Sequence, residues 1–222
     1  WTKAFGMRAA LAAADVVLQD IRRLAASYDR VAIACDAKGP SFRASIFPAY
    51  KANRSDTRTP DKRAALDTLK SLCARDWHVF TAPCHPDHDG YYYESDDVIA
   101  AIVAWCVSQG IPADVATGDS DLAQLVDDSA SIRLVRVFNG QFVLMGATAV
   151  EAWQGVPPAR ILEVKALAGD GDGYKPFPGI GVDTAIKFLR AAPEFTARSV
   201  VESTIAAGVV FNKDGKTENK SA

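Results

Sequence analysis

Ten acidic residues lie between Cys84 and Asp128, and no lysine or arginine lies among them. So many uncompensated carboxylates would repel one another in a folded domain, so we expect several of them to converge on divalent cations. Carboxylate oxygens favour Mg²⁺ or Mn²⁺ over zinc. The ten acids are Asp87, Asp89, Glu94, Asp96, Asp97, Asp114, Asp119, Asp121, Asp127 and Asp128.

Three acidic clusters and one single aspartate occupy positions where ligands gather. The first cluster precedes an apolar run with helical spacing, which places it at a helix start. The second cluster and the single aspartate each follow a short apolar run, and the carboxyl ends of parallel strands form the ligand crevice of an open α/β sheet. Acids at one helix start could simply complement the helix dipole, but this alternative does not explain three clusters. The single aspartate is Asp36, and the clusters are Glu94, Asp96 and Asp97; Asp119 and Asp121; and Asp170 and Asp172 in a glycine-rich turn.

A basic stretch runs from Lys38 to Arg63, although the net charge of the chain is −2. Its seven basic residues face only two acids, Asp56 and Asp61. Aromatic residues are interleaved with these charges, which favours a surface that grips a nucleic-acid strand over a merely solvated face. The basic residues are Lys38, Arg43, Lys51, Arg54, Arg58, Lys62 and Arg63, and the aromatic residues are Phe42, Phe47 and Tyr50.

The composition limits the class of protein. With 222 residues, of which 49% are hydrophobic, the chain can bury a full core. No apolar stretch has the length of a membrane span and no signal peptide is present, so we expect a soluble, intracellular protein. The four cysteines form no CxxC pattern, which predicts reduced thiols. Residues 84–88, Cys-His-Pro-Asp-His, could hold a soft metal, but no second cysteine pair lies nearby.

Strands that alternate with helices predict an α/β fold, Rossmann-like, with a largely parallel sheet flanked by helices. We expect strands at 31–35, 78–82, 113–117, 132–137 and 141–144, and helices at 5–28, from 60, at 94–109, after 121 and from 148 onward. Residues 37–59 contain Gly39, Pro40 and Pro48, which predicts a long loop or arch. The predicted domains are a core over 1–147, with the arch at about 37–60, and a helical subdomain with a polar, loose tail over 148–222.

The Pro-Gly-Ile-Gly sequence at 178–181 precedes another helical pattern. The glycines that flank Ile180 would let backbone N–H groups approach a phosphate at the start of that helix, as in a helix–hairpin–helix that grips duplex backbone. The alternative is a tight turn between helices with no ligand.

Six blocks of sequence, in one order, resemble the flap endonuclease or five-prime nuclease family, particularly the nuclease domain of bacterial DNA polymerase I and its phage relatives. The resemblance implies a PIN-like core with an arch and a C-terminal helix–three-turn–helix subdomain. It also implies a metal-dependent enzyme of replication and repair, a flap endonuclease and 5'-3' exonuclease that cuts DNA where a five-prime strand leaves a duplex. The blocks are 35–43, 50–54, 94–97, 117–125, 155–158 and 166–181.

The resemblance also implies roles for individual residues. Two Mg²⁺ or Mn²⁺ ions roughly 3.5–4 Å apart would activate the nucleophile and stabilise the leaving oxygen. Asp36, Glu94, Asp96 and Asp97 resemble ligands of the first ion, and Asp119, Asp121, Asp170 and Asp172 those of the second. Lys51 and Arg54 resemble the arch residues that steer the scissile phosphate. The expected DNA contacts are Arg43, Tyr50, Gly179, Ile180, Gly181 and Lys187, with a K⁺ ion at the turn of Gly179–Gly181.

The implied partner is DNA with a 5' flap or junction, or an RNA primer, bound by a monomer that is fused to or acts with a DNA polymerase. Two departures from the family stand out. The family begins with a strand that carries a further metal-binding aspartate, so we expect a longer protein that includes this strand. The turn that holds Asp170 and Asp172 is one residue shorter than usual, which makes Asp172 the weaker ligand candidate. The alternatives are a DNA-junction binding module with impaired catalysis and a PIN-like ribonuclease, which would not need the turn at 178–181.

Overall fold

The computed structural model describes residues 7–54, 59–191, 196, 199, 210–211 and 217–218. These residues belong to two compact units, which we describe separately. The first unit comprises Trp1–Ile46 and Arg54–Ile99, and the second comprises Phe47–Asn53 and Ala100–Ala222. The boundary that the sequence predicts between the core, 1–147, and the helical subdomain, 148–222, stays a prediction.

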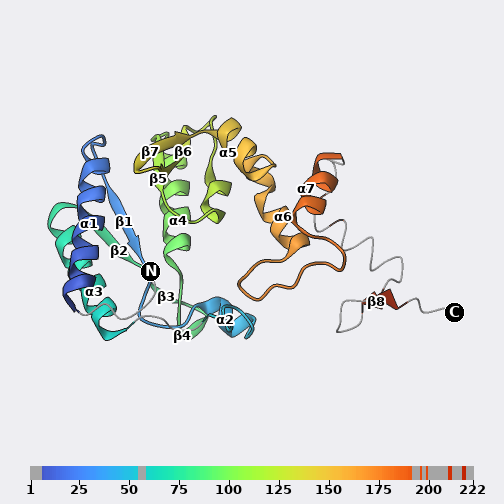
Figure 1. Cartoon of the computed structure of the whole chain (residues 1–222), viewed down its shortest axis with the longest axis horizontal. Coiled ribbons are helices and arrows are strands. Elements are labelled where there is room, and N and C mark those ends of the chain that lie inside the picture. Colours follow the sequence, from blue (N-terminus) through green and yellow to red (C-terminus); the bar gives the residue numbers. More distant parts are fainter. Residues whose placement is uncertain are drawn as a thin grey trace. The chain divides into compact units, whose positions relative to one another are not determined.

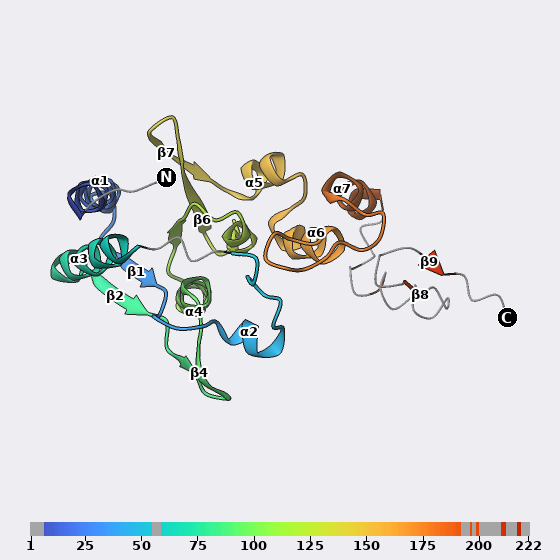
Figure 2. The ribbon, with the colours of Figure 1, turned by 60° about the horizontal axis from the view of Figure 1, so that its bottom comes forward.

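The first unit is built on a parallel pair of strands covered by two helices. Strand β1 (Ala32–Cys35) pairs in parallel with β2 (His78–Thr81). Helices α1 (Met7–Ala25) and α3 (Pro60–Asp76) pack side by side next to the strands (Figure 1 and Figure 2). Strand β1 ends at Cys35 and Asp36 follows it directly, as the sequence pattern predicts.

A short helix and a hairpin complete the first unit. The stretch expected to be one long loop at 37–59 contains the helix α2 (Phe42–Ile46), and its residues 55–58 lie outside the described part. Strands β3 (Cys84–His85) and β4 (His88–Tyr92) form an antiparallel hairpin that contacts α2. Five helical residues are too few to produce a visible period, so the sequence gives no sign of α2.

Helix α4 (Ser95–Ser108) begins in the first unit and ends in the second. Its predicted start is confirmed, because Asp96 and Asp97 lie in its first turn and favour the positive end of the helix dipole. Val103 and Cys106, three residues apart, are its buried side chains.

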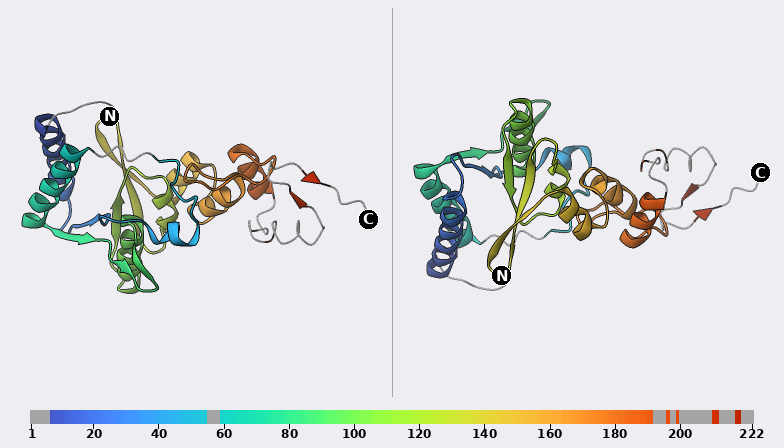
Figure 3. Two further views of the ribbon diagram at one scale, coloured as in Figure 1. Left: turned by 90° about the horizontal axis from the view of Figure 1, so that it is seen from below. Right: turned by 90° about the horizontal axis from the view of Figure 1, so that it is seen from above.

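The second unit contains a three-stranded sheet in the order β5-β6-β7. Strand β5 (Ala113–Ala116) pairs in parallel with β6 (Ile132–Phe138), and β6 pairs antiparallel with β7 (Gln141–Met145). Figure 3 shows β6 and β7 as a long hairpin. Asn139 and Gly140 both have positive φ, as a two-residue hairpin turn requires. After β5 the chain forms a 3-10 helix, η1 (Asp121–Leu125), in place of the expected α-helix.

Helices make up the rest of the second unit, as the pattern after residue 148 predicts. They are α5 (Ala147–Gln154), the 3-10 helix η2 (Pro158–Arg160), α6 (Ile161–Ala168) and α7 (Val182–Ala191). Helices α6 and α7 contact each other (Figure 1), and the buried residues of the two helices include Val164, Leu167, Ala185 and Leu189. In the tail the described residues form β8 (Val210–Phe211) and β9 (Thr217–Glu218), while most of the predicted loose tail lies outside the described residues.

The α/β character and the parallel pairing are confirmed. The described strands form four separate sheets, however, so the expected single sheet is not what this part of the chain builds. Within the described residues, no helix has the length and apolar character needed to cross a membrane.

Candidate metal centre

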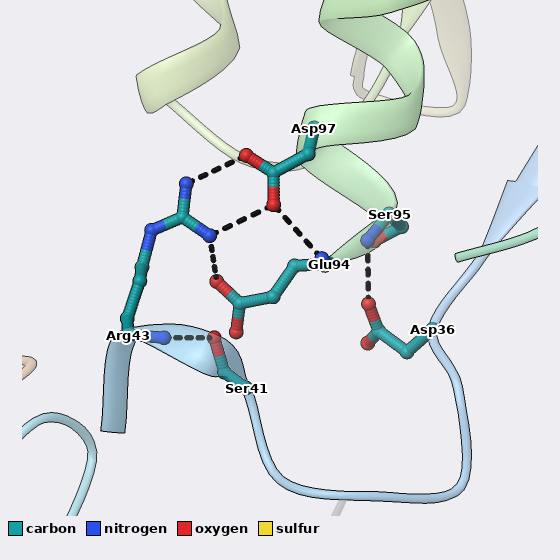
Figure 4. A network of polar contacts seen from close by, with 6 residues as sticks. All are labelled: Asp36, Ser41, Arg43, Glu94, Ser95 and Asp97. Carbon is teal, nitrogen blue, oxygen red and sulfur yellow. Dashed lines mark hydrogen bonds and ion pairs between the residues drawn. The ribbon is translucent and has the colours of Figure 1, made fainter. Parts of the chain in front are cut away.

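The first acidic group forms where β1 meets the start of α4. The Asp36 carboxylate follows β1, and its Oδ1 atom accepts a hydrogen bond of 2.8 Å from the backbone N–H of Ser95 (Figure 4). This bond places Asp36 beside the helix end that carries Glu94 and Asp97. A strand end and a helix start, 59 residues apart in the chain, thus bring together acids that the sequence assigns to one site.

Arg43 ties two of these carboxylates together (Figure 4). Its guanidinium donates to Asp97 through both terminal nitrogens, at 2.6 and 2.8 Å, and to Glu94 Oε2 at 3.2 Å. Asp97 Oδ2 also accepts the backbone N–H of Glu94 at 2.8 Å, as in a helix capping box. The side chains are largely covered, so this forked cation offsets much of the repulsion between the two acids.

The second acidic group starts in the loop after β5. Asp119 Oδ1 accepts the backbone N–H of Asp121 at 2.9 Å, and the backbone N–H of Asp119 donates to Thr117 Oγ1 at 3.0 Å. These local bonds form a tight turn directly after the strand. Asp119 is exposed and Asp121 is half-buried.

Lys165 of α6 joins this loop to the glycine-rich turn after the helix. Its ammonium forms an ion pair with Asp121 Oδ1 and lies 3.6 Å from Asp170 Oδ2. Burial alone lowers the pKa of Lys165, but the hydrogen bond to Asp121 and the charges of Asp121, Asp170 and Asp119 outweigh it and raise the pKa above its ordinary value. One ammonium therefore lies among the carboxylates that the sequence assigns to the second ion.

Asp172 has a different environment from Asp170. Its backbone N–H donates to Asp170 Oδ1 at 2.5 Å, and its backbone carbonyl accepts the N–H of Lys51 at 2.8 Å. The carbonyl of Gly171 accepts the side-chain amide of Asn53 at 2.9 Å. The glycine-rich turn therefore uses two of its carbonyl groups to hold residues 47–53, which we call the docked segment.

Packing reinforces the docked segment. The rings of Phe47 and Tyr174 stack with centroids 5.0 Å apart. Gly173 has φ +111°, and a Cβ atom there would lie 2.4 Å from the carbonyl oxygen of Ala49. Only glycine allows this approach without strain, so the turn and the segment fit each other closely.

The donor set fits a hard divalent cation. Within the described part of the chain, no three His, Cys, Asp or Glu side chains are gathered closely enough to hold a metal ion. In each group a side-chain cation, Arg43 or Lys165, lies against the carboxylates. The possible ligands in both groups are carboxylate oxygens, which are the ligands that Mg²⁺ and Mn²⁺ prefer.

The residues expected to contact DNA occupy several places. Arg54 is exposed, and the ammonium of Lys51 lies 4.9 Å from the ring centre of Tyr50. Lys187 is exposed on α7. Arg43, which we expect from the sequence to contact DNA, has its guanidinium engaged by Glu94 and Asp97. The DNA contacts of these residues stay predictions.

The turn before α7 leaves its backbone open. Gly179 has φ +79°, which favours glycine, and the N–H of Ile180 donates to Phe177 O at 2.9 Å. A Cβ atom on Gly179 or Gly181 would meet nothing within 4 Å. The turn is therefore tight as well as accessible, which suits a close approach of phosphate.

The histidines at 84–88 are engaged in packing, which the sequence does not predict. His85 stacks on Phe42 with ring centres 4.5 Å apart, and the rings of His85 and His88 meet edge to face at 4.6 Å. His88 Nδ1 is hydrogen-bonded to Ser45 Oγ at 2.8 Å. Among the described residues this cluster offers no metal-binding group.

Comparison with known proteins identifies the family. The family model described as "5'-3' exonuclease, N-terminal resolvase-like domain" matches residues 5–154. This match covers more than half of the 222 residues, and the chain belongs to this nuclease family.

Curated relatives extend beyond the length of this chain. The 5'-3' exonuclease of Streptomyces coelicolor is 35% identical over 156 residues, which are 68% of this chain and 51% of that protein. DNA polymerase I of Mycobacterium tuberculosis is 32% identical over 179 residues, which are 79% of this chain and 18% of the polymerase. The chain thus spans about half of the exonuclease and less than a fifth of the polymerase.

Solved structures share the fold. The D15 protein of bacteriophage T5, co-crystallised with metal ions, has a TM-score of 0.68 at 22% identity and covers 85% of this chain and 71% of its own. The T5 5'-exonuclease with bound zinc has a TM-score of 0.68 at 20% identity, over 86% of this chain and 70% of its own. These likenesses extend the α/β nuclease fold beyond the stretch that the family model matches.

Proposed function

We propose that this chain is a metal-dependent 5' nuclease that hydrolyses DNA phosphodiesters where a five-prime strand leaves a duplex. Family membership supports the reaction class. The observation that carries the proposal is the second acidic group, in which Asp121, at the start of η1, and Asp170, in the glycine-rich turn, face one cation.

The carboxylates would hold Mg²⁺ or Mn²⁺, two ions in all. Asp36, Glu94, Asp96 and Asp97 form the first ligand set, and Asp119, Asp121, Asp170 and Asp172 form the second. When bound, the ions supply Lewis-acid activation of water and of the phosphodiester. The chain's own part is to hold the acids at a strand end, a helix start and two tight turns.

The docked segment positions a cation for the scissile phosphate. Lys51 has φ +54° and is held through its backbone N–H by Asp172, so its place is set by the turn that carries the second acidic group. A fixed positive charge stabilises the negative charge that develops on phosphate in the transition state. Arg54 adds a second, exposed cation three residues further on. Tyr50 would stack a base of the bound strand.

The segment from α6 to α7 grips duplex DNA as a helix–three-turn–helix. Support comes from the open backbone at Gly179 and Gly181 and from the helix that follows directly, whose first N–H groups attract phosphate. Lys187 adds a positive charge on α7, and a K⁺ ion between the carbonyl groups of this turn and a DNA phosphate would complete the contact. Ile180 lies between the two glycines, and its backbone N–H donates to the carbonyl of Phe177.

The relatives support a proposal for the biological setting. DNA polymerase I proteins carry a similar stretch within a much longer chain. We infer that this chain acts as a monomer in the cytoplasm, fused to or together with a DNA polymerase, on flaps or RNA primers left by replication and repair.

A panel of labelled substrates tests the proposal. The protein should cut a 5' flap near its junction in Mg²⁺ and should leave it intact in EDTA. It should leave a 3' flap uncut. A 5' flap that is bound but never cut would favour the alternative of a junction-binding module, and cutting of unpaired RNA at the same rate would favour a PIN-like ribonuclease.

A further inference from the structure

Lys165 has an environment unlike that of the other cation beside the acids. Arg43 grips its carboxylates with a fork of three hydrogen bonds. Lys165 presents a single ammonium on a flexible stem to Asp121 and Asp170, and its side chain is 31% exposed. A compact point charge of this kind can leave by rotation of its stem, whereas a forked guanidinium is fixed by its geometry.

Buried side chains other than Lys165 anchor α6. Val164 and Leu167, the neighbours of Lys165 in the helix, are buried and anchor the helix without the lysine. The carboxylates of Asp121 and Asp170 are 34% and 21% exposed, so solvent and ions reach them.

We propose that Lys165 is a displaceable internal counter-ion of the second acidic group: it holds Asp121 and Asp170 together without metal and moves away when a divalent cation binds. This inference rests on the proposed function, because it concerns the same carboxylates. An ammonium and a metal ion compete for the same oxygens. Lys165 therefore stabilises the metal-free protein and weakens its affinity for metal.

The role predicts opposite effects of one substitution. Lys165→Met keeps most of the aliphatic stem and removes the charge. Without metal the acids repel one another, so the unfolding midpoint in EDTA should fall by about 2–4 °C. When metal binds to Lys165→Met, no ammonium has to leave the carboxylates of Asp121 and Asp170. The affinity of this variant for metal should therefore be about two- to fivefold higher than that of the parent, a size typical of the loss of an accessible ion pair. A residue that only supports the fold would lower the midpoint without raising the affinity.

The affinity for metal can be measured without DNA by titrating the protein with Mn²⁺. The electron paramagnetic resonance signal of the free ion reports how much Mn²⁺ remains unbound. The variant Asp170→Asn removes one carboxylate of the second acidic group. Mn²⁺ ions that the parent binds and this variant does not are therefore assigned to the second acidic group. Lys187→Met, with the same change of charge at an exposed position of α7, should match the parent in both measurements. Lys165→Arg should bind Mn²⁺ more weakly than the parent, because a forked cation is harder to displace.

The outcomes separate the two ideas. Mn²⁺ affinity that Lys165→Met leaves unchanged or weakens would overturn the counter-ion role and leave the nuclease proposal standing. If Lys165→Met does not fold, the arginine variant decides, and Mn²⁺ affinity at or above that of the parent would refute the role. A parent protein that binds no Mn²⁺ at the second group would overturn both.

Discussion

Gly173→Ala tests whether the glycine-rich turn positions Lys51. The added Cβ atom would lie 2.4 Å from the carbonyl oxygen of Ala49, a distance that side-chain movement cannot relieve because the obstacle is backbone. The backbone of Gly173, at φ +111°, is also strained for any residue with a Cβ atom. We expect the docked segment to separate from the turn.

The size of the effect follows from the contacts that would be lost. The segment has two hydrogen bonds to the turn, from Lys51 and Asn53, each contributing about 0.5–1.5 kcal/mol net. The stack of Phe47 on Tyr174 contributes about 0.5–1.5 kcal/mol more. Opening of the segment should therefore become easier by roughly 1.5–4.5 kcal/mol. The exchange of the Lys51 amide hydrogen should accelerate by about tenfold to a thousandfold.

Hydrogen exchange with Gly171→Ala as the control measures this directly. Gly171 lies in the same turn, but a Cβ atom there meets nothing within 4 Å and its φ is not positive. This control should protect the Lys51 amide as the parent does, while turnover of a 5' flap falls only in Gly173→Ala. Equal protection of the amide in both variants would refute the claim that the turn holds the segment.

Other substitutions and one labelling experiment test separate parts of the account. Lys51→Ala and Arg54→Ala should slow cleavage at saturating DNA, by roughly 2–4 kcal/mol of barrier, more than they weaken binding measured in Ca²⁺, and the reverse pattern would make both residues ordinary backbone contacts. Gly179→Val should weaken binding to duplex-containing DNA and leave Mn²⁺ binding intact, because a β-branched residue is strained at φ +79° and blocks the approach of phosphate; equal losses on unpaired strands would show that the turn is only structural. Iodoacetamide should label exposed Cys84 well before Cys73, since Cys73 is buried and burial raises the pKa of its thiol, and equal rates would contradict this packing.

Local patterns predicted the elements that place the acids. The apolar run before Asp36 ends where β1 ends, and the acids at the start of the predicted helix at 94–109 lie where α4 begins. A strand end and a helix start depend on residues that are close together in the chain, so the periodicity of the sequence predicts them. The membership of the nuclease family follows from the same blocks of sequence.

The partners of the acids could not be predicted in this way. Nothing in the sequence around Arg43 or Lys165 distinguishes them from other basic residues on a helix. Their carboxylate partners, Asp97 and Asp121, are more than forty residues away in the chain and are brought close only by folding. The docked segment depends on backbone carbonyl groups of a turn, which leave no trace in residue types. The histidines at 84–88 suggested a soft metal because the residue types alone do not show their aromatic contacts. His85 stacks on Phe42 within a β3–β4 hairpin, and the strands of this hairpin are too short to produce a visible period in the sequence.

The central claim is that the acidic groups hold the metal ions of a nuclease, and cleavage of a 5' flap by Asp119→Ala tests it most directly. Asp89→Ala, which removes an exposed acid of the same charge-rich stretch outside both groups, is the matched control. In Mg²⁺ we expect Asp119→Ala to lose at least about a hundredfold in turnover with an unchanged or higher unfolding midpoint, and Asp89→Ala to cut like the parent. Cleavage by Asp119→Ala at the parent rate would contradict the metal assignment.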